Sequence, residues 1–374
     1  MPFLAESPRN WPLLRVGVWG RLLGSVLYES LVWLRLGLYR LRLLPVERAP
    51  VPVISVGNLT VGGTGKTPVV EFLLRSLAPR SVVVLTRGYG RKSRSTVQRF
   101  RAEEQVSLSA ERLGDEPFLL AQRHPQVSVY ASASRKWSSR LAMVWDAPEC
   151  LVLDDAFQHL AMARDLNLLL IDAERGLGNR HLLPTGPLRE PLSQVRRADA
   201  LLLTKANLGF AEAHLHQLRR ALQFDGPIFR FEYHPEALVR LDGKVEVEVR
   251  SGWSKPVFAS CGVGQPGGFR KVLEQLGAEV VQWEALKDHQ AYEPSRVAAL
   301  QRAFRQSGAQ RWVVTEKDAV KLRAFPELGA EVWVLRMQVV PDPAWEAFFQ
   351  EFLARHRLLP EGPPGFTSPE ERRP

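Results

Sequence analysis

Short apolar runs alternate with amphipathic stretches through the first two thirds of the chain. Runs rich in Val, Leu and Ile occupy residues 53–56, 82–86, 127–130, 150–153, 166–171 and 200–204, and apolar residues at helical spacing fill 67–77 and 116–123. Short, wholly apolar strands separated by helices are typical of a parallel sheet that is covered on both faces. The pattern therefore predicts an α/β fold with a mostly parallel sheet and flanking helices over residues 46–228.

The pattern changes after residue 227. Apolar and polar residues alternate at 228–233 and at 245–249, with Asp242 and Gly243 between them. A period of two predicts exposed strands, and Asp-Gly is typical of a hairpin turn. We expect a β-ribbon that joins the first domain to a smaller C-terminal α/β domain, together covering residues 229–357. Residues 358–374 contain five prolines and are predicted to be disordered.

The N-terminal arm, residues 1–45, is rich in Leu, Trp and Arg. Its arginines leave no uncharged stretch near the roughly 20 residues that a membrane-spanning helix needs. It also lacks the features of a cleaved signal peptide. We predict one or two helices that either lie in the headgroup region of a membrane or pack on the next domain with their arginines pointing outward.

Basic residues outnumber acidic ones, 50 against 40, which gives a formal net charge of +10 at pH 7. Such an excess favours phosphorylated metabolites, acidic lipid or nucleic acid as partners. We do not expect nucleic acid, because no aromatic and basic recognition module occurs. Cys150 and Cys261 lie beside apolar runs without metal-ligand spacing. Both are therefore expected to be core residues, with no disulfide and no structural zinc.

The strongest chemical signal is a glycine-rich loop between the run at 53–56 and the helical stretch at 67–77. Backbone N–H groups of such a loop can point at phosphate oxygens, and the start of the helix adds a favourable dipole. Lys66 would reach the β and γ phosphates, and the Thr67 hydroxyl would bind Mg²⁺. The alternative is a simple glycine-rich turn, since Thr60 replaces the first glycine of the strict motif. The predicted nucleotide-binding residues are Thr60, Val61, Gly62, Gly63, Thr64, Gly65, Lys66 and Thr67. With this loop after its first strand, the predicted α/β fold is of the P-loop NTPase type.

Phosphoryl transfer on such a loop also needs an acidic residue at the end of a buried strand to hold magnesium. Asp154 and Asp155 follow the run at 150–153. Two adjacent carboxylates repel each other, and a divalent cation would offset that repulsion. A capping Asp in the next turn explains one of them without a metal. Asp172, after the run at 166–171, is a rival for the same role.

Other polar residues lie where acid, base or phosphate chemistry is possible. Asp115 follows Gly114 at the start of a helical stretch and is either its N-cap or a base for an attacking hydroxyl. His289, in a polar loop of the second domain, is either solvated or able to tune such a base. Arg189 and Glu190, in the loop at 183–191, either serve phosphate and metal or form an exposed ion pair.

The choice of nucleotide rests on a weaker pattern. Residues 204–207 have the shape of the guanine-reading loop of GTPases but lack its final Asp. We therefore favour ATP over GTP.

In this order, the motifs resemble those of the tetraacyldisaccharide 4′-kinase family, the lipid A 4′-kinases. The resemblance extends from the N-terminal arm to about residue 357. Its motifs are residues 57–68, 87–90, 114–117, 154–159, 183–191, 288–289 and 315–318. One departure is Gln290, where the family usually has a second His after its Asp-His pair.

The resemblance implies that the chain uses ATP and Mg²⁺ to phosphorylate the 4′-hydroxyl of tetraacyldisaccharide 1-phosphate. It implies a peripheral protein at the cytoplasmic face of the inner membrane, with this lipid as substrate and the membrane surface as partner. We expect a monomer.

The resemblance also assigns roles to residues. Asp115 would be the base, with His289 as its partner, while Lys66 and Arg189 neutralise phosphate charge. The implied magnesium ligands are Thr67, Asp154, Asp155 and Glu190.

The rival interpretation is a P-loop switch ATPase or GTPase, or a metallochaperone, because such proteins also carry a Gly-Gly-x-Gly-Lys-Thr loop. Metal-delivery members often contain His- or Cys-rich runs, and this chain has none.

Overall fold

The computed structural model describes residues 18–88, 97–101, 114–208, 212–249, 253, 255–287 and 290–359. The first half of this part contains the strands β1 (Val53–Asn58), β2 (Val82–Thr86), β3 (Val97–Phe100), β4 (Ser128–Ser132), β5 (Cys150–Asp154), β6 (Leu166–Asp172) and β7 (Ala200–Thr204). Its helices are α1 (Val18–Arg40), α2 (Lys66–Leu77), α4 (Asp115–Arg123), α5 (Arg135–Trp145) and α6 (Glu212–Leu222).

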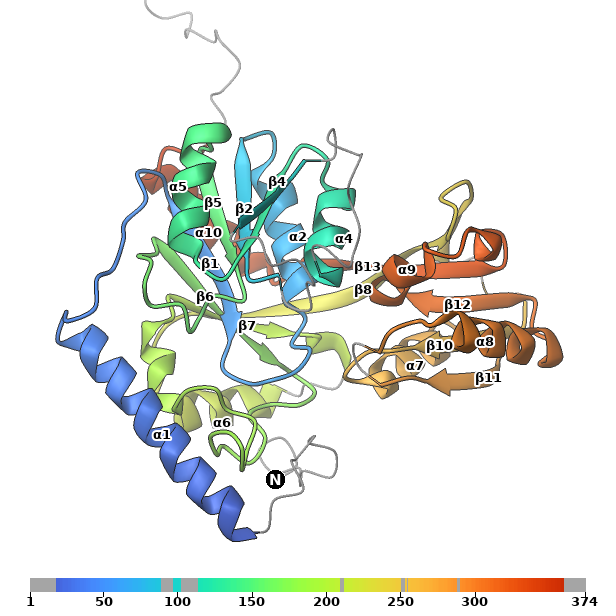
Figure 1. The fold of residues 1–374 in the computed structure, drawn as a ribbon, viewed down its shortest axis with the longest axis horizontal. Coiled ribbons are helices and arrows are strands. Elements are labelled where there is room, and N and C mark those ends of the chain that lie inside the picture. The colour runs from blue at the N-terminus through green and yellow to red at the C-terminus, as the bar shows by residue number, and fades with distance from the viewer. Residues whose placement is uncertain are drawn as a thin grey trace, which may run out of the picture.

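The second half contains the strands β8 (Ile228–Arg240), β9 (Glu246–Glu248), β10 (Val257–Cys261), β11 (Val280–Ala285), β12 (Arg311–Thr315) and β13 (Val332–Pro341). Its helices are α7 (Pro266–Gln275), α8 (Pro294–Gln306), α9 (Glu316–Leu322) and α10 (Pro343–Arg355). Within the described residues, all these strands join one 13-stranded sheet in the order β11-β10-β12-β13-β8-β7-β6-β1-β5-β2-β4-β3, with β9 paired to β8 (Figure 1).

The predicted mostly parallel sheet with flanking helices is confirmed. All six apolar runs of the first half form strands, and β2, β5, β1, β6 and β7 pair in parallel. Each of these five strands is buried along its whole length. Burial on both faces explains why the runs lack polar alternation. Because parallel strands point the same way, the loops after β1, β5 and β6 meet at one edge of the sheet.

A long antiparallel pair, β8 with β13, connects the two halves of the sheet. The last part of the expected ribbon at 228–249 forms a hairpin, in which residues 237–239 of β8 pair with 246–248 of β9 and Gly243 closes the turn by donating to the Arg240 carbonyl at 2.8 Å. Residues 228–231 of β8 instead pair with β7, and residues 231–240 pair with β13, so β8 lies inside the sheet and is not the exposed strand that was predicted. Helix α10 then returns to the first half, where Trp345 is fully buried in the same core as β1 and α2. The domain boundary near residue 229 stays a prediction, because the two halves share this core.

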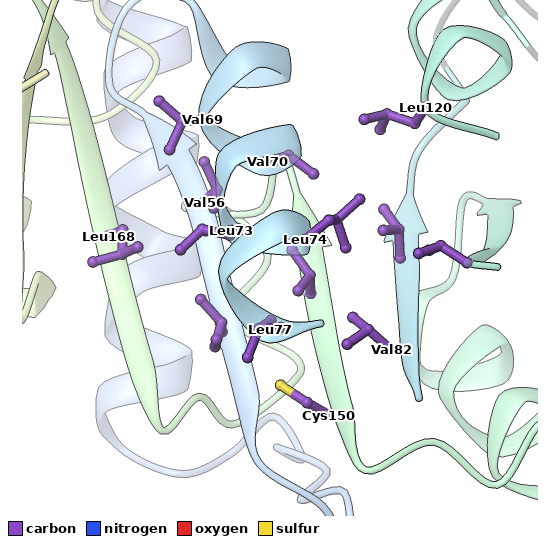
Figure 2. Packing of buried hydrophobic residues seen from close by; sticks show 14 of the residues in the cluster. Val56, Val69, Val70, Leu73, Leu74, Leu77, Val82, Leu120, Cys150 and Leu168 are labelled. Carbon is purple, nitrogen blue, oxygen red and sulfur yellow. The ribbon is translucent and has the colours of Figure 1, made fainter. Parts of the chain in front are cut away.

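The core that positions the glycine-rich loop is built around α2. One face of α2 is wholly apolar and buried, and Figure 2 shows Leu73 and Leu77 pointing at the sheet beside Val56 and Cys150. Burying a side chain of this size stabilises the fold by about 1.5–3 kcal/mol. The same packing fixes the start of α2 against the end of β1. Both Cys150 and Cys261 are buried and free, as expected.

Helix α1 packs on the first half through one face only. Leu36 is buried, and the Ser25 hydroxyl lies 3.1 Å from the Thr185 hydroxyl. The opposite face exposes large apolar side chains, among them Leu23, Leu27 and Leu34. In the described part of the chain, no helix combines the length and apolar character needed to cross a bilayer. The proline-rich tail that was predicted to be disordered lies outside the described residues from position 360 onward.

Candidate active site

The glycine-rich loop connects β1 to α2 and leaves the start of the helix open. Gly62 and Gly65 have φ angles of 106° and 75°, a left-handed conformation that L side chains rarely adopt. Gly65 is also the N-cap of α2, and no side chain caps the helix there. The N–H groups of the first turn therefore remain available to an anion, as a phosphate-binding loop requires.

Hydrogen bonds from three separate elements hold the loop in this shape. The Tyr233 hydroxyl of β8 donates to the Gly65 carbonyl at 2.6 Å, and the Thr204 hydroxyl of β7 donates to the Thr64 carbonyl at 2.8 Å. The Val61 N–H donates to the Pro187 carbonyl at 2.8 Å. Two of these bonds use loop carbonyls and the third uses the N–H of Val61, so the N–H groups at the start of α2 stay free and the loop is organised for phosphate before any nucleotide binds.

Lys66 points toward the carboxyl end of β5. Its Nζ lies 3.4 Å from Asp155 Oδ1 and 3.4 Å from Asn58 Oδ1. Asp155 has a φ of 48°, which is unusual for a residue with a side chain and is often found at functional sites. This backbone conformation turns Asp155 back over the glycine-rich loop and places its carboxylate beside the lysine.

Arg189 reaches the same carboxylate from the loop at 183–191. Its Nη1 lies 2.9 Å from Asp155 Oδ1 and 3.1 Å from Oδ2. Burial alone would raise the pKa of Asp155, but Lys66 and Arg189 outweigh it and lower the pKa below its usual value. Asp155 is therefore a carboxylate with two cations beside it at the mouth of the loop.

Asp154, the last residue of β5, has a different environment. The Thr86 hydroxyl donates to its Oδ2 at 3.2 Å, whereas its buried Oδ1 has no hydrogen-bond partner in the described structure. Burial, with smaller contributions from Glu116 and Asp155, raises the pKa of Asp154 to about 7. A buried carboxylate oxygen without a partner is costly and rare, and a cation is a common explanation.

These residues fit a magnesium ion. Asp154 offers the unpartnered oxygen, Asp155 a second carboxylate, and Thr67 is the half-buried second residue of α2. The described residues contain no cluster of three or more His, Cys, Asp and Glu side chains suited to a metal. Two carboxylates and a hydroxyl suit Mg²⁺, which retains several waters and binds through one or two carboxylates plus substrate phosphates.

Glu190 is separate from this pair. It is 1% exposed, and both its oxygens pair with arginines, one with Arg197 and the other with Arg35 of α1 at 3.5 Å. It does not join Asp154 and Asp155 in a metal-holding group. The interpretation of Arg189 and Glu190 as an exposed ion pair is wrong, because the two side chains contact different partners. As placed, Glu190 attaches α1 to the loop that carries Arg189.

The rival acidic residue, Asp172, is engaged by other groups. Its Oδ2 lies 2.6 Å from Lys205 Nζ, and its Oδ1 accepts from the N–H groups of Glu174 and Arg175. Lys205 also donates to Gln265 at 2.6 Å, just before α7. Asp172 therefore links the first half to the second and needs no metal to balance its charge.

The expected base, Asp115, is the first residue of α4, and its side chain lies outside the described set. The next residue, Glu116, is near enough to raise the pKa of Asp154. Glu116 also lies 3.7 Å from Lys317 of α9. The start of α4 is thus placed beside the acidic pair and against the second half. Its expected partner, His289, falls outside the described residues.

Residues 21–354 match the family model described as tetraacyldisaccharide-1-P 4′-kinase. The chain belongs to this family.

Curated relatives and a solved structure agree with that assignment. The tetraacyldisaccharide 4′-kinase of Syntrophus aciditrophicus is 37% identical over 88% of this chain and 91% of its own length. That of Aquifex aeolicus is 38% identical over 82% of this chain and 90% of its own length. The crystal structure of the Aquifex aeolicus family member in complex with ATP matches with a TM-score of 0.71 and 34% identity, over 90% of this chain and 98% of that one.

Family membership confirms the resemblance drawn from the sequence and the P-loop type of α/β fold. It also confirms the expected class of enzyme, a kinase with an alcohol group as acceptor. The rival interpretations as a switch ATPase or GTPase, or as a metallochaperone, are not favoured.

Three residues of the site were missed by sequence reasoning. Asn58 faces Lys66 and also donates to the Thr60 carbonyl at 2.8 Å, while Tyr233 holds the loop from β8. Arg135, at the start of α5, is buried and donates to the Asp154 carbonyl at 3.1 Å. Asn58 gave the same signal as Asp154, a polar residue that ends an apolar strand. The other two had no local signal, because both reach the site from distant segments.

Proposed function

We propose that this family member transfers the γ-phosphoryl group of ATP to the 4′-hydroxyl of tetraacyldisaccharide 1-phosphate at a membrane surface. The observation that carries the transfer chemistry is the meeting of Lys66 and Arg189 on Asp155, beside an open helix start and the unpartnered oxygen of Asp154. Cations, acidic groups and free N–H donors at one edge of a sheet match what a phosphoryl group needs.

The nucleotide-binding part of the proposal uses residues 60–67. The N–H groups at the start of α2 hold the phosphates, and Lys66 exchanges its contact with Asp155 for one with a phosphate oxygen. Arg189 neutralises the charge that develops on the transferred group. Such preorganised cations act most strongly where water is excluded, and Lys66 is about nine-tenths buried, with 10% of its side chain exposed.

Asp154, Asp155 and Thr67 are proposed to hold Mg²⁺. When bound there, Mg²⁺ would supply positive charge next to the phosphates. Asp154 must release its proton before it can bind a cation, and its pKa of about 7 places that step near neutral pH. Glu190 is a weaker candidate than the sequence suggested, because Arg35 and Arg197 already occupy its oxygens.

Asp115 is proposed as the base, on its position at the start of α4. A carboxylate in the first turn of a helix is stabilised in its ionised form by the helix dipole, so it can accept a proton from the attacking hydroxyl. His289 would orient it from the second half. The neighbouring Gln290 supports this, because its carbonyl accepts from Lys321 of α9 at 3.1 Å, and α9 contacts α4 through Lys317 and Glu116.

The membrane part of the proposal rests on α1. Its exposed residues Leu23, Leu27 and Leu34 share one helical face, since they are separated by multiples of about 3.6 residues. An acylated substrate has its reactive headgroup at the lipid surface, so a kinase for it gains from an apolar face that docks there. A monomer at the cytoplasmic face of the inner membrane remains our expectation.

The test is transfer of radiolabelled γ-phosphate from ATP to tetraacyldisaccharide 1-phosphate in detergent micelles. We expect a labelled lipid bisphosphate with the unaltered enzyme and none with Lys66→Ala. Phosphate released to water without labelled lipid would refute the acceptor. Asp115→Ala is expected to lose about 10³-fold in kcat, and normal turnover in that variant would refute the assignment of the base.

A further inference from the structure

Helix α5 carries a second exposed apolar face and covers the face of the sheet opposite to α2. Trp137 and Val144 are 55% and 76% exposed, and Trp145 is 54% exposed. Trp137 and Val144 are seven residues apart and lie on one side of the helix, while Ala142 and Ser138 are buried on the opposite side. Isolated exposed apolar residues are common, but aromatic and aliphatic residues on one helical face form a patch that needs an explanation.

Positive charge accompanies this patch. The Arg140 guanidinium lies over the Trp137 ring, 5.4 Å from its centroid, and Lys136 is on the next turn. Arg140 also forms two 2.8 Å hydrogen bonds with Glu47. Trp beside Arg and Lys, with an apolar residue on the same face, is the composition that lies at the boundary between lipid headgroups and acyl chains.

The segment that follows α1 joins this patch to the apolar face of α1. Leu41, Leu43 and Val46 are exposed in it. Lys136 of α5 donates to the Pro45 carbonyl at 3.0 Å, and the Glu47 contacts with Arg140 fix the segment against the same helix. In Figure 1, α1, this segment and α5 follow one edge of the molecule. The segment therefore links α1 to α5 and carries exposed apolar residues of its own between them.

We propose that the exposed face of α5, with residues 41–46, is a second membrane-contact element that binds a bilayer containing acidic phospholipid. This inference rests on the membrane part of the proposed function and adds a second attachment to α1. A second lipid contact adds to the affinity of the first, because membrane binding grows with the apolar area that is buried in the lipid. The formal net charge of +10 and the exposed Arg40 favour acidic lipid over neutral lipid or an uncharged protein face.

Two attachments would also fix the orientation of the site. Arg135, the first residue of α5, donates to the Asp154 carbonyl, and Arg35 of α1 pairs with Glu190 next to Arg189. Both lipid-facing elements thus contact residues in or next to the proposed catalytic cluster. Resting on both of them would hold the site at a constant height and tilt above the lipid surface, where the headgroup of an acylated acceptor lies.

The experiment measures sedimentation of the full-length protein with large phosphatidylcholine vesicles, with and without phosphatidylglycerol. We expect Trp137→Gln with Val144→Gln to weaken partitioning by about ten-fold, because both apolar contacts are lost. Val281→Gln, at an exposed apolar residue of β11, is the matched control and should not change it. Arg40→Gln should weaken binding only to vesicles that contain phosphatidylglycerol, by about five-fold.

Leu27→Gln with Leu34→Gln separates this inference from the proposed membrane role of α1. If that variant loses binding and the α5 variant behaves like Val281→Gln, the α5 inference is overturned while the role of α1 stands. If the unaltered protein does not sediment with any vesicle, both fail, and the micelle assay still tests phosphoryl transfer. If the α5 variant changes the mass in light scattering instead of vesicle binding, the face contacts a second copy and the inference is overturned.

Discussion

Replacing Asp154 with Asn is expected to stabilise the ligand-free protein at alkaline pH while it abolishes catalysis. Burial raises the pKa of this carboxyl to about 7, far above the value that it has in an unfolded chain. The folded protein therefore binds a proton that the unfolded chain has already released. It follows that the stability contributed by this group is present at low pH and is lost as the pH rises through about 7.

The size of the effect follows from the linkage relation. A group with a folded pKa of about 7 loses about 1.4 kcal/mol of stability between about pH 6 and about pH 8, because the unfolded chain is ionised throughout that range. Asn cannot titrate, so Asp154→Asn loses none of it. Other groups that titrate in this range, such as Glu316, are common to both proteins and cancel in the comparison.

The assay is thermal unfolding of Asp154→Asn and of the unaltered protein without nucleotide, at about pH 6 and about pH 8. The Tm of Asp154→Asn minus the Tm of the unaltered protein should be on the order of 1–3 °C larger at about pH 8 than at about pH 6. Kinase activity of the variant should fall by about 10³-fold, because Asn lacks the charge that a cation needs. A Tm difference that is equal at both pH values would refute the raised pKa and, with it, the link between burial and cation binding.

Three further predictions follow from the contacts described above. Arg189→Ala should lower kcat by about 10²–10³-fold, because both the charge and the planar donors are lost. Arg189→Lys should lower it by about ten-fold, because Lys keeps the charge but not the planar donors, and steady-state kinetics would measure both losses. Gly65→Ala would place a Cβ 2.4 Å from the Tyr233 hydroxyl at a φ of 75°, so we expect loss of ATP binding in a calorimeter. Gly243→Ala is its control, with a φ of 74° and nothing within 4 Å of the added Cβ, and should cost only about 1–2 kcal/mol of stability. Trp345→Ala should cost about 3–5 kcal/mol in denaturant unfolding, and a loss below about 1 kcal/mol would contradict its place in the core.

The sheet of the first half was predictable because its strands are buried on both faces. In β6 the polar residues are Asn167 and the final Asp172, and the remaining residues are apolar because neither face of the strand meets solvent. This apolar run is visible in the sequence. The edge strand β3 was not predicted, since Val97–Phe100 is only partly buried and alternates weakly. The return of α10 was also missed, because the surface that it covers is made of residues more than 100 positions away.

The candidate site shows the same division between local and distant signals. Asp154, Asp155 and Lys66 were found because each lies at the end of a strand or the start of a helix. The contact of Arg189 with Asp155 could not be derived from spacing, and its separation from Glu190 was not foreseen. Neighbours in sequence on an extended loop point in opposite directions, so Glu190 faces Arg35 and Arg197 while Arg189 faces the glycine-rich loop.

The shared core of α2 and α10 has a consequence for how the chain is made. Phe72 and Phe231 both contact the Trp345 ring, with centroid distances of 6.3 and 5.1 Å. A ribosome releases Phe72 long before Trp345, so a growing chain carries the earlier rings uncovered until α10 has been made. Uncovered apolar surface of this kind invites chaperones or aggregation. A premature stop within α10 would therefore remove part of the central core, and we expect such products to be degraded rather than to persist as slightly shortened kinases.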